Sequence, residues 1–360
     1  MKLSVIHGGK LRTIQLGNKW AGDNEPVYVI AEIGNNHQGD VSIAKELIKE
    51  AAEAGADAVK FQKRKITRIL NLEGLEMPYE NRNSFGKTYG EHRRALELSE
   101  ADYAELKTYA EQRGVDFIAS GWDEESIDFL DELGVPFFKM ASADLSNFPL
   151  LEYTAKKNKP MILSTGMSDI EMVKDAVGLT KQHTEQIAIL QCTSTYPASF
   201  EEIHLNVIKT YADQFPEMVI GYSGHELGIA ITAAAVVMGA KIVERHFTLD
   251  RTMKGNDHAA SLEPRGLAKL IRDIHHIETA MGLPEKTIQE SEYAVFKKLT
   301  KSVVSAATIK TGIPLTREML TTKGPGTGIS PTRLNELIGK KALHDIDADR
   351  VIMEADIDWR

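Results

Sequence analysis

The sequence predicts an α/β fold, a parallel (β/α)8 barrel of the TIM type followed by a small C-terminal domain. Two observations lead to this prediction. Short apolar runs alternate with helix-like segments over roughly 250 residues, the span of a typical barrel. Polar residues also follow nearly every run, as expected where all strands end at one mouth. An open doubly wound sheet, the main alternative, would gather only those polar residues near its switch point.

Composition and charge narrow the class of protein. The chain has 360 residues, 42% of them hydrophobic and 26% charged, and its length suggests two domains. A net charge of −9 argues against general affinity for nucleic acid or an anionic membrane, but leaves room for a local basic pocket. The single cysteine, Cys192, excludes an internal disulfide. Without a signal-peptide pattern or a long apolar run, we expect a soluble cytoplasmic protein.

The expected domains follow from where the alternation starts and stops. They are an N-terminal decoration at 1–26, the barrel at 27–282, a polar linker at 283–300 and a second domain at 301–360. In the decoration, apolar and polar residues alternate from Lys2 to Leu16, which predicts a hairpin. In the second domain we expect short strands at 302–306 and 352–355 and one helix near 331–338.

The elements of the barrel can be assigned in order. The predicted strands are 27–33, 56–62, 115–120, 136–140, 161–164, 187–192, 219–222 and 241–245. Apolar residues at helical spacing predict helices at 43–51, 100–113, 124–133, 169–182, 201–214, 227–238 and 265–280. Asp40 is the expected N-cap of the first helix, and Gly55 ends it. A long polar insertion, 63–97, interrupts the pattern.

Two histidines at matching strand ends predict a divalent-metal site. His225 follows one predicted strand and His246 the next. A lone histidine is more often structural, but this pair lies at corresponding positions. Two imidazoles completed by water and substrate oxygens suit Mn²⁺ or a similar octahedral ion better than Zn²⁺, which usually has a third strong protein ligand. Glu226 and Asp257 are candidates to orient the metal ligands.

Two lysines, Lys60 and Lys139, end predicted buried strands, where an unpaired ammonium is costly. Pairing with core carboxylates is one explanation, and a Schiff-base lysine is another. A pocket for phosphate or carboxylate explains them better, because hydroxyls follow the neighbouring strands. These hydroxyls belong to Ser120, Ser142, Ser164, Thr165, Ser194 and Ser223.

Further polar residues lie near the same mouth. Glu32 ends the first strand, where it can orient a sugar hydroxyl or move a proton, unless it only caps a helix or forms an ion pair. Asp257 follows the loop 254–256, which is either a lid or an ordinary turn. The segment 79–94 is dense in donors, among them His92 and Arg93, so it is either a solvated surface loop or a second phosphate site.

Eight motifs occur in a fixed order along the chain. They are AEIGNNH at 31–37, VKFQ at 59–62, FKMAS at 138–142, LSTGM at 163–167, QCTSTYP at 191–197, YSGH at 222–225, ERHFT at 244–248 and PGTGIS at 325–330. Together they resemble the sialic acid synthase family, from about residue 27 to the C-terminus. The resemblance implies a (β/α)8 barrel, an antifreeze-like (SAF) domain and a domain-swapped homodimer. It also implies condensation of phosphoenolpyruvate with an N-acylhexosamine, such as N-acetylmannosamine or its 6-phosphate, with release of phosphate and a requirement for Mn²⁺ or Mg²⁺.

The resemblance also implies roles for individual residues. His225 and His246 would bind the metal, and Glu32 and Asp257 would join them as catalytic residues. Phosphoenolpyruvate would be held by Lys60, Ser120, Lys139, Ser142, Ser164, Ser194 and Ser223. Glu32, Gln62, Tyr196 and Asp257 would face the sugar, and Asp144 and Lys323 complete the expected substrate-binding set.

The sequence departs from the bacterial pattern of this family. Bacterial members often have Arg before the last Pro-Gly, reaching the partner subunit's sugar, whereas here Gly324 follows Lys323. They also tend to have Asn and Asp where this chain has Ser194 and Gly224. Motifs around His92, Ser120 and Tyr222 are more similar to the animal-type synthases, which prefer the sugar 6-phosphate. We therefore expect a 6-phosphate substrate, with the basic insertion as its candidate site.

Three other functions are alternatives for this sequence. The first is a Schiff-base aldolase that uses Lys60 or Lys139, and the second is a non-catalytic sugar-binding barrel. The third is ice binding by the C-terminal domain, which would require a flat, regular array. Thr321, Thr322 and Thr327 lie in a glycine-rich turn without such a period.

Overall fold

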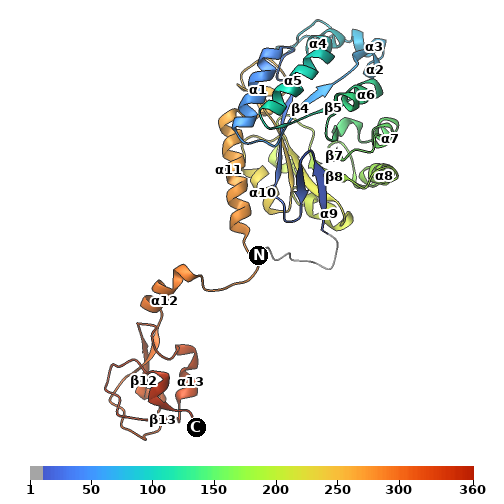
Figure 1. Cartoon of the computed structure of the whole chain (residues 1–360). Coiled ribbons are helices and arrows are strands. Elements are labelled where there is room, and N and C mark those ends of the chain that lie inside the picture. Colours follow the sequence, from blue (N-terminus) through green and yellow to red (C-terminus); the bar gives the residue numbers. More distant parts are fainter. Residues whose placement is uncertain (1–10) are drawn as a thin grey trace. The chain divides into compact units, whose positions relative to one another are not determined.

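The structure, a computed structural model, describes residues 11–360. After Gly282 the chain divides into two compact units, each with its own hydrophobic core (Figure 1). The predicted N-terminal hairpin lies partly outside the described residues. Its described part, β1 (Thr13–Leu16), pairs antiparallel with β2 (Lys19–Gly22).

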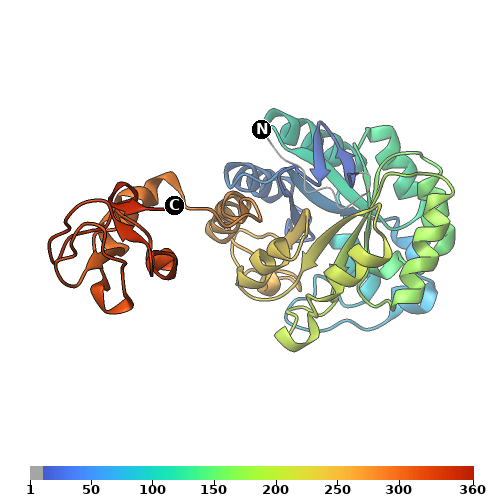
Figure 2. The ribbon, with the colours of Figure 1, turned by 90° about the horizontal axis from the view of Figure 1, so that it is seen from below.

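Eight parallel strands form the sheet of the first unit, in the order β5-β4-β3-β10-β9-β8-β7-β6. The first and last strands of this order contact each other, so the sheet is a nearly closed barrel with helices outside it (Figure 2). Its strands are β3 (Tyr28–Gly34), β4 (Ala58–Lys63), β5 (Asp116–Gly121), β6 (Phe138–Met140), β7 (Met161–Ser164), β8 (Ile187–Cys192), β9 (Val219–Gly224) and β10 (Ile242–His246). The predicted fold class is confirmed.

The helices that cover the barrel follow the strands in the chain. They are α1 (Val41–Glu53), α5 (Glu100–Gln112), α6 (Glu124–Leu133), α7 (Phe148–Ala155), α8 (Ile170–Lys181), α9 (Val207–Gln214), α10 (Ala230–Val237) and α11 (Pro264–Met281). Asp40 caps α1 as expected, since its side chain accepts from the backbone N–H groups of Ser42 and Ile43. No helix in residues 11–360 combines the length and apolar character needed to cross a membrane.

Successive side chains of a strand point alternately outward and into the barrel, and they belong to two separate hydrophobic cores. Val29, Ala31 and Ile33 of β3 pack outward against helices, whereas Tyr28 and Ile30 point into the barrel. The interior residues form one cluster with Ile14, Leu16 and Ala21 of the N-terminal hairpin. The hairpin therefore packs against the barrel's interior core, while the next inward residue of β3, Glu32, lies at the carboxyl end of the strands.

Several predicted boundaries are wrong. The helix expected at 201–214 begins only at Val207, because His204 has a left-handed backbone with φ of +49° and follows a short 3-10 turn, Phe200–Glu202. The strand expected at 352–355 is a 3-10 turn, Glu354–Asp356, in its second half. The linker contains α12 (Tyr293–Leu299). The insertion contains α2 (Ile66–Ile69), α3 (Leu72–Glu76) and α4 (Tyr89–Ala95).

The second unit is built from short antiparallel pairs around a small core. β11 (Ser302–Ser305) pairs with β12 (Leu320–Lys323), and β13 (Lys341–Ala342) pairs with β14 (Ile357–Asp358). One short helix, α13 (Leu334–Leu337), covers them. The core includes Val303, Ile309, Leu315, Leu320, Ile329, Leu337 and Ile352.

Candidate functional site

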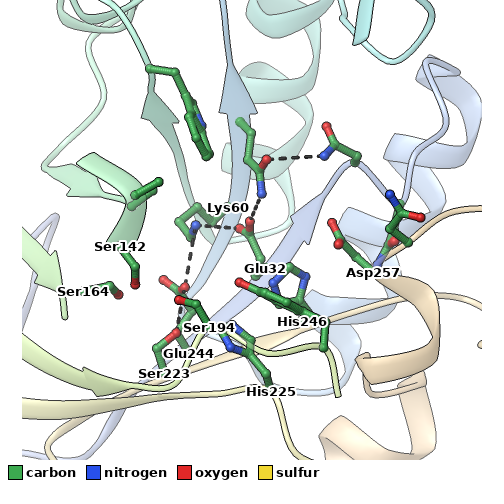
Figure 3. A pocket seen from close by; sticks show the side chains of 18 of the residues that line it. Glu32, Lys60, Ser142, Ser164, Ser194, Ser223, His225, Glu244, His246 and Asp257 are labelled. Carbon is green, nitrogen blue, oxygen red and sulfur yellow. Dashed lines mark hydrogen bonds and ion pairs between the residues drawn. The ribbon is translucent and has the colours of Figure 1, made fainter. Parts of the chain in front are cut away.

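A cavity of about 290 Å³ lies at the carboxyl ends of the barrel strands (Figure 3). The strand period of two directs Glu32 of β3, Lys60 of β4 and His246 of β10 into it. Most of the predicted site residues line this cavity. They are Glu32, Lys60, Gln62, Lys139, Ser142, Ser164, Ser194, Tyr196, Ser223, His225, His246 and Asp257.

Three predicted site residues lie elsewhere. Ser120 is buried, does not line the cavity and accepts a hydrogen bond from Lys60 Nζ at 3.4 Å. Asp144 is in the 3-10 turn after β6, where its Oδ1 accepts from Asn147 at 3.1 Å and its Oδ2 has no partner. Lys323 lies on β12 of the second unit and pairs with Asp349. Ser120 therefore reaches the site only through Lys60.

The floor of the cavity is a buried cluster of two lysines and two carboxylates. Lys60 Nζ lies 2.9 Å from Glu32 Oε2 and 3.6 Å from Glu244 Oε1. Lys139 Nζ lies 3.7 Å from Glu244 Oε2 and donates to Ser164 Oγ at 2.7 Å. Both lysines thus pair with core carboxylates and also face the cavity, so these two explanations of the lysines are compatible.

Burial and pairing set the protonation of this floor. Burial opposes ionisation of Glu244, but the attraction of Lys139 and Lys60 outweighs it and lowers the pKa of Glu244 to about 2. Burial raises the pKa of Glu32 in spite of the opposing attraction of Lys60. Burial also lowers the pKa of Lys139. Glu244 is therefore ionised, whereas Glu32 is the better suited of the two to exchange a proton.

The two histidines lie together at one side of the cavity, with ring centroids 5.3 Å apart. His225 Nδ1 lies 2.7 Å from the carbonyl oxygen of Thr193, which favours the tautomer protonated at Nδ1. Burial opposes protonation of this ring, but hydrogen bonding to Cys192 outweighs it and raises the pKa of His225. Burial lowers the pKa of His246 to about 4, so this ring is neutral, and its Nδ1 has no partner. The neutral ring of His246, with its free Nδ1, suits metal ligation, whereas His225 would have to exchange its hydrogen bond with Cys192 for the metal. The described residues contain no set of three or more His, Cys, Asp and Glu placed to share an ion.

Glu226 does not orient these histidines, contrary to one expectation. Its carboxylate accepts from Tyr222 Oη at 2.8 Å, from Thr232 Oγ1 at 2.8 Å and from Arg245 Nη1 at 2.9 Å. The Glu226–Arg245 pair is completely buried. Glu226 is therefore part of a structural network, and the carbonyl of Thr193 takes the role at His225.

Small residues form a narrow cup beside Lys139. Ser142 Oγ accepts from the backbone N–H of Gly166 at 3.0 Å, and Ser194 Oγ is buried without a partner. A Cβ added at Gly166 would lie 2.1 Å from Ser194 Oγ and 2.9 Å from Ser142 Oγ. Cys192 also lines the cup; burial opposes its ionisation, but hydrogen bonding to His225 lowers its pKa to about 7. The cup offers polar groups of a size suited to a small anion.

Sequence reasoning missed several lining residues. Glu244 had a signal, because it is two residues before His246 and therefore points to the same side of the strand. Arg64 had a similar signal beyond β4, in step with Lys60 and Gln62. No sequence signal indicated that Trp122 and Phe85 line the cavity. Part of the insertion does reach the cavity, since His92 and Arg93 are among its lining residues.

Buried lysines, a hydroxyl cup and two adjacent imidazoles define the class of site: one suited to an anionic substrate. The comparisons agree with this class. The NeuB family profile matches residues 47–286, and the SAF domain profile matches 300–358. The chain belongs to the NeuB family and ends in a SAF domain.

Named relatives extend over nearly the whole chain. N-acetylneuraminate-9-phosphate synthase of Homo sapiens is 49% identical over 341 residues, which cover 94% of this chain and 95% of the relative. N,N'-diacetyllegionaminic acid synthase of Legionella pneumophila is 37% identical, with 94% and 96% covered. The solved N-acetylneuraminic acid synthetase of Leptospira borgpetersenii, in complex with citrate, superposes with a TM-score of 0.71 at 34% identity, covering 80% of this chain and 96% of that one.

Proposed function

We propose that the protein is a sialic acid synthase that condenses phosphoenolpyruvate with N-acetylmannosamine 6-phosphate, or a related N-acylhexosamine, and releases phosphate. The observation that carries this proposal is the single cavity that joins the lysine floor, the hydroxyl cup and the histidine pair. The near-full-length likeness to a 9-phosphate synthase supports it. The product would be a nonulosonic acid, phosphorylated where the sugar is.

Phosphoenolpyruvate would bind at the floor and cup. Lys60 and Lys139 provide buried ammonium groups, and Ser142, Ser164 and Ser194 provide hydroxyls around them. The floor is already balanced by Glu32 and Glu244, so the lysines are held in place before the substrate arrives. Such fixed charges lower the barrier of a reaction in which anionic charge shifts, because they need no reorganisation.

The histidines would hold the divalent metal, Mn²⁺ or Mg²⁺. When bound, this ion would supply Lewis-acid polarisation of the aldehyde of the open-chain sugar. The contact of His225 Nδ1 with the Thr193 carbonyl and the buried neutral ring of His246 are the features of the chain that suit this role. Tyr196 packs on the rings of both, 4.1 Å from His225 and 5.6 Å from His246 between centroids, and keeps them in place.

The reaction forms one C–C bond and breaks one C–O bond. Carbon 3 of phosphoenolpyruvate attacks the aldehyde carbon, whose oxygen takes a proton. Water adds at carbon 2 and gives up a proton, and the tetrahedral intermediate then expels phosphate. Glu32, with its raised pKa, would carry protons in these steps, and Asp257 lies on the same cavity as a second candidate.

The alternative function, a Schiff-base aldolase, requires a lysine whose amine is neutral, because only a neutral amine attacks a carbonyl. The attraction of Glu244 and Glu32 outweighs burial and raises the pKa of Lys60, whereas burial lowers the pKa of Lys139, so Lys139 is the lysine that would serve a Schiff-base enzyme. Borohydride treatment in the presence of substrate would trap a Schiff base. We expect no covalent adduct and expect chelators to stop the reaction.

A domain-swapped homodimer is the proposed assembly. The helix α12, between the barrel and the SAF core, exposes Tyr293, Phe296 and Leu299 in the single chain. These residues recur at every third position and so share one side of the helix. A second copy of the chain would cover this apolar side.

His246→Ala tests the proposed function. We expect phosphate release from phosphoenolpyruvate plus N-acetylmannosamine 6-phosphate, with Mn²⁺ present, to fall by a factor of about 1,000 or more, because one of two protein ligands is lost. Calorimetric Mn²⁺ binding should weaken in the same variant. The control is His276→Ala on the exposed surface of α11, which should retain both. Near-normal turnover in His246→Ala would overturn the metal assignment.

A further inference from the structure

Arg64 is a buried guanidinium at the mouth of the cavity. It follows β4 directly and is 4% exposed. It donates to Gln62 Oε1 and to Asn35 Oδ1, the latter at 3.2 Å, and it lies over the ring of Trp122 at 4.4 Å. Its Nε has no hydrogen-bond partner. Within residues 11–360, no carboxylate forms an ion pair with it.

Arg93 faces the same cavity from α4 of the insertion. Its Nε donates to Tyr89 Oη at 2.9 Å, and its guanidinium lies over that ring at 4.9 Å. It too lacks a carboxylate partner in the part of the chain that the structure describes. Arg93 is close enough to contribute, after burial, to lowering the pKa of Arg64 to about 10. The two guanidinium groups therefore repel each other across the mouth.

Two lysines nearby differ from Arg64 and Arg93 because each of them has a carboxylate partner. Lys63 Nζ pairs with Glu97 at 2.8 Å, and Lys60 Nζ pairs with Glu32 at 2.9 Å. Asp257 lines the cavity near Arg64 without pairing with it. A buried cation such as Arg64 is unfavourable without a counter-ion, and the half-buried Arg93 beside it adds to this cost, unless a ligand supplies the negative charge. Guanidinium groups are well suited to phosphate, which they bind through paired hydrogen bonds.

We propose that Arg64 and Arg93 bind the 6-phosphate of the sugar substrate and so select the phosphorylated hexosamine. This inference rests on the proposed function. Lys60 and Gln62 of β4 and Arg64 directly after it occupy alternate positions, so the Cα of Arg64 stands roughly 13 Å beyond that of Lys60 at the strand rise per residue. The aldehyde end of the sugar would lie at the histidines near the floor, and its phosphate at the mouth.

The mouth is held together by contacts between segments distant in sequence. Asn256 Nδ2 donates to Tyr79 Oη at 2.7 Å, and Lys254 Nζ lies 4.6 Å from the centre of the Phe85 ring. These contacts join the insertion that carries Arg93 to the loop that carries Asp257. The distance between Arg93 and the rest of the site is therefore fixed by the fold rather than by ligand binding alone.

The test compares two sugars in three variants. We expect Arg93→Gln to lower kcat/KM for N-acetylmannosamine 6-phosphate about ten- to a hundredfold, as for the loss of one charge-assisted contact, and to change kcat/KM for N-acetylmannosamine less than threefold. Arg64→Gln should act in the same direction. Arg94→Gln is the matched control, because Arg94 is on the same helix but is exposed and outside the cavity. It should leave both values unchanged.

Binding without turnover separates this inference from the proposed function. Calorimetric titration with N-acetylmannosamine 6-phosphate alone should give a Kd at least tenfold higher in Arg93→Gln than in wild type or Arg94→Gln. Wild type that binds this sugar but releases phosphate with neither sugar would overturn the function and leave the subsite supported. Equal losses for both sugars, or no loss of binding in Arg93→Gln, would overturn the subsite. The retained rate with the free sugar shows that the variant is folded.

Discussion

At the scale of single residues, Glu244 connects the two lysines of the floor. It lies 3.6 Å from Lys60 Nζ and 3.7 Å from Lys139 Nζ, and it accepts from Ser223 Oγ at 3.3 Å. Glu32 pairs with Lys60 only. Removal of the Glu244 charge would leave Lys139 without a carboxylate within ion-pair distance among the described residues. Breaking one side of a buried ion pair is strongly destabilising.

Glu244→Gln should therefore lower the free energy of unfolding by about 3 kcal/mol, the lower end expected for a broken buried pair. Urea unfolding at pH 7 measures this. Glu171→Gln is the control, since its pair with Lys174 is at the surface and contributes at most about 1 kcal/mol. If both variants lost the same small amount, Glu244 would not be the counter-ion of the floor.

Site residues could be predicted from the sequence where they lie at the end of a barrel strand. The sequence predicted a shared site for Lys60, Lys139, His225 and His246. All four are ionisable side chains at the ends of apolar strands, where a purely structural role is a poor explanation. Glu244 was missed, although its position two residues before His246 on the same strand indicated that the two side chains share a side. The contact of Arg64 with Trp122 could not be predicted, because it depends on the register of β4 and β5, in which Lys63 pairs with Gly121.

At the scale of elements, the turn after β7 closes the hydroxyl cup. Its Gly166 donates to Ser142 Oγ at 3.0 Å, and any Cβ there would meet Ser194 and Ser142. Gly166→Ala should therefore displace both hydroxyls and raise KM for phosphoenolpyruvate about tenfold, the loss of one ordinary hydrogen bond or slightly more. KM for the sugar should change little. Initial rates with each substrate varied in turn measure this.

A suitable control for that variant is Gly178→Ala in α8, where a new Cβ meets nothing within 4 Å. It should leave both KM values unchanged and slightly stabilise the helix. A Gly166→Ala enzyme with normal KM for phosphoenolpyruvate would show that the cup does not hold this substrate.

Strands were easier to predict than irregular segments. Each barrel strand is a short apolar run, and the structure places all eight within a few residues of their predicted bounds. The segment 201–214 has helical apolar spacing throughout, but the left-handed backbone at His204 separates its first turn from α9. The spacing of apolar residues does not predict such a break, because the break depends on how Ile203 and Leu205 pack against the barrel.

At the scale of the whole molecule, three buried histidines are held neutral. Burial lowers the pKa of His37, His92 and His246 to about 4 in each case. In the unfolded chain a histidine has a pKa of about 6.5. Between these values the unfolded chain binds more protons, so the free energy of unfolding falls as the pH drops from 7 to 5. For one fully buried histidine this fall is on the order of 2 kcal/mol.

His37→Gln isolates one of these contributions. His37 is 2% exposed and has no part in the proposed metal site, and its Nδ1 accepts from the Gly39 N–H at 3.0 Å, which a glutamine oxygen can replace. We expect the variant to lose about 2 kcal/mol less than wild type between pH 7 and pH 5, because glutamine takes up no proton. Urea unfolding at both pH values, with a chelator present so that metal binding adds nothing, measures the difference. His276→Gln, exposed on α11, should lose as much as wild type. An identical loss in His37→Gln would mean that His37 is already protonated in the folded protein, and that burial does not set its pKa.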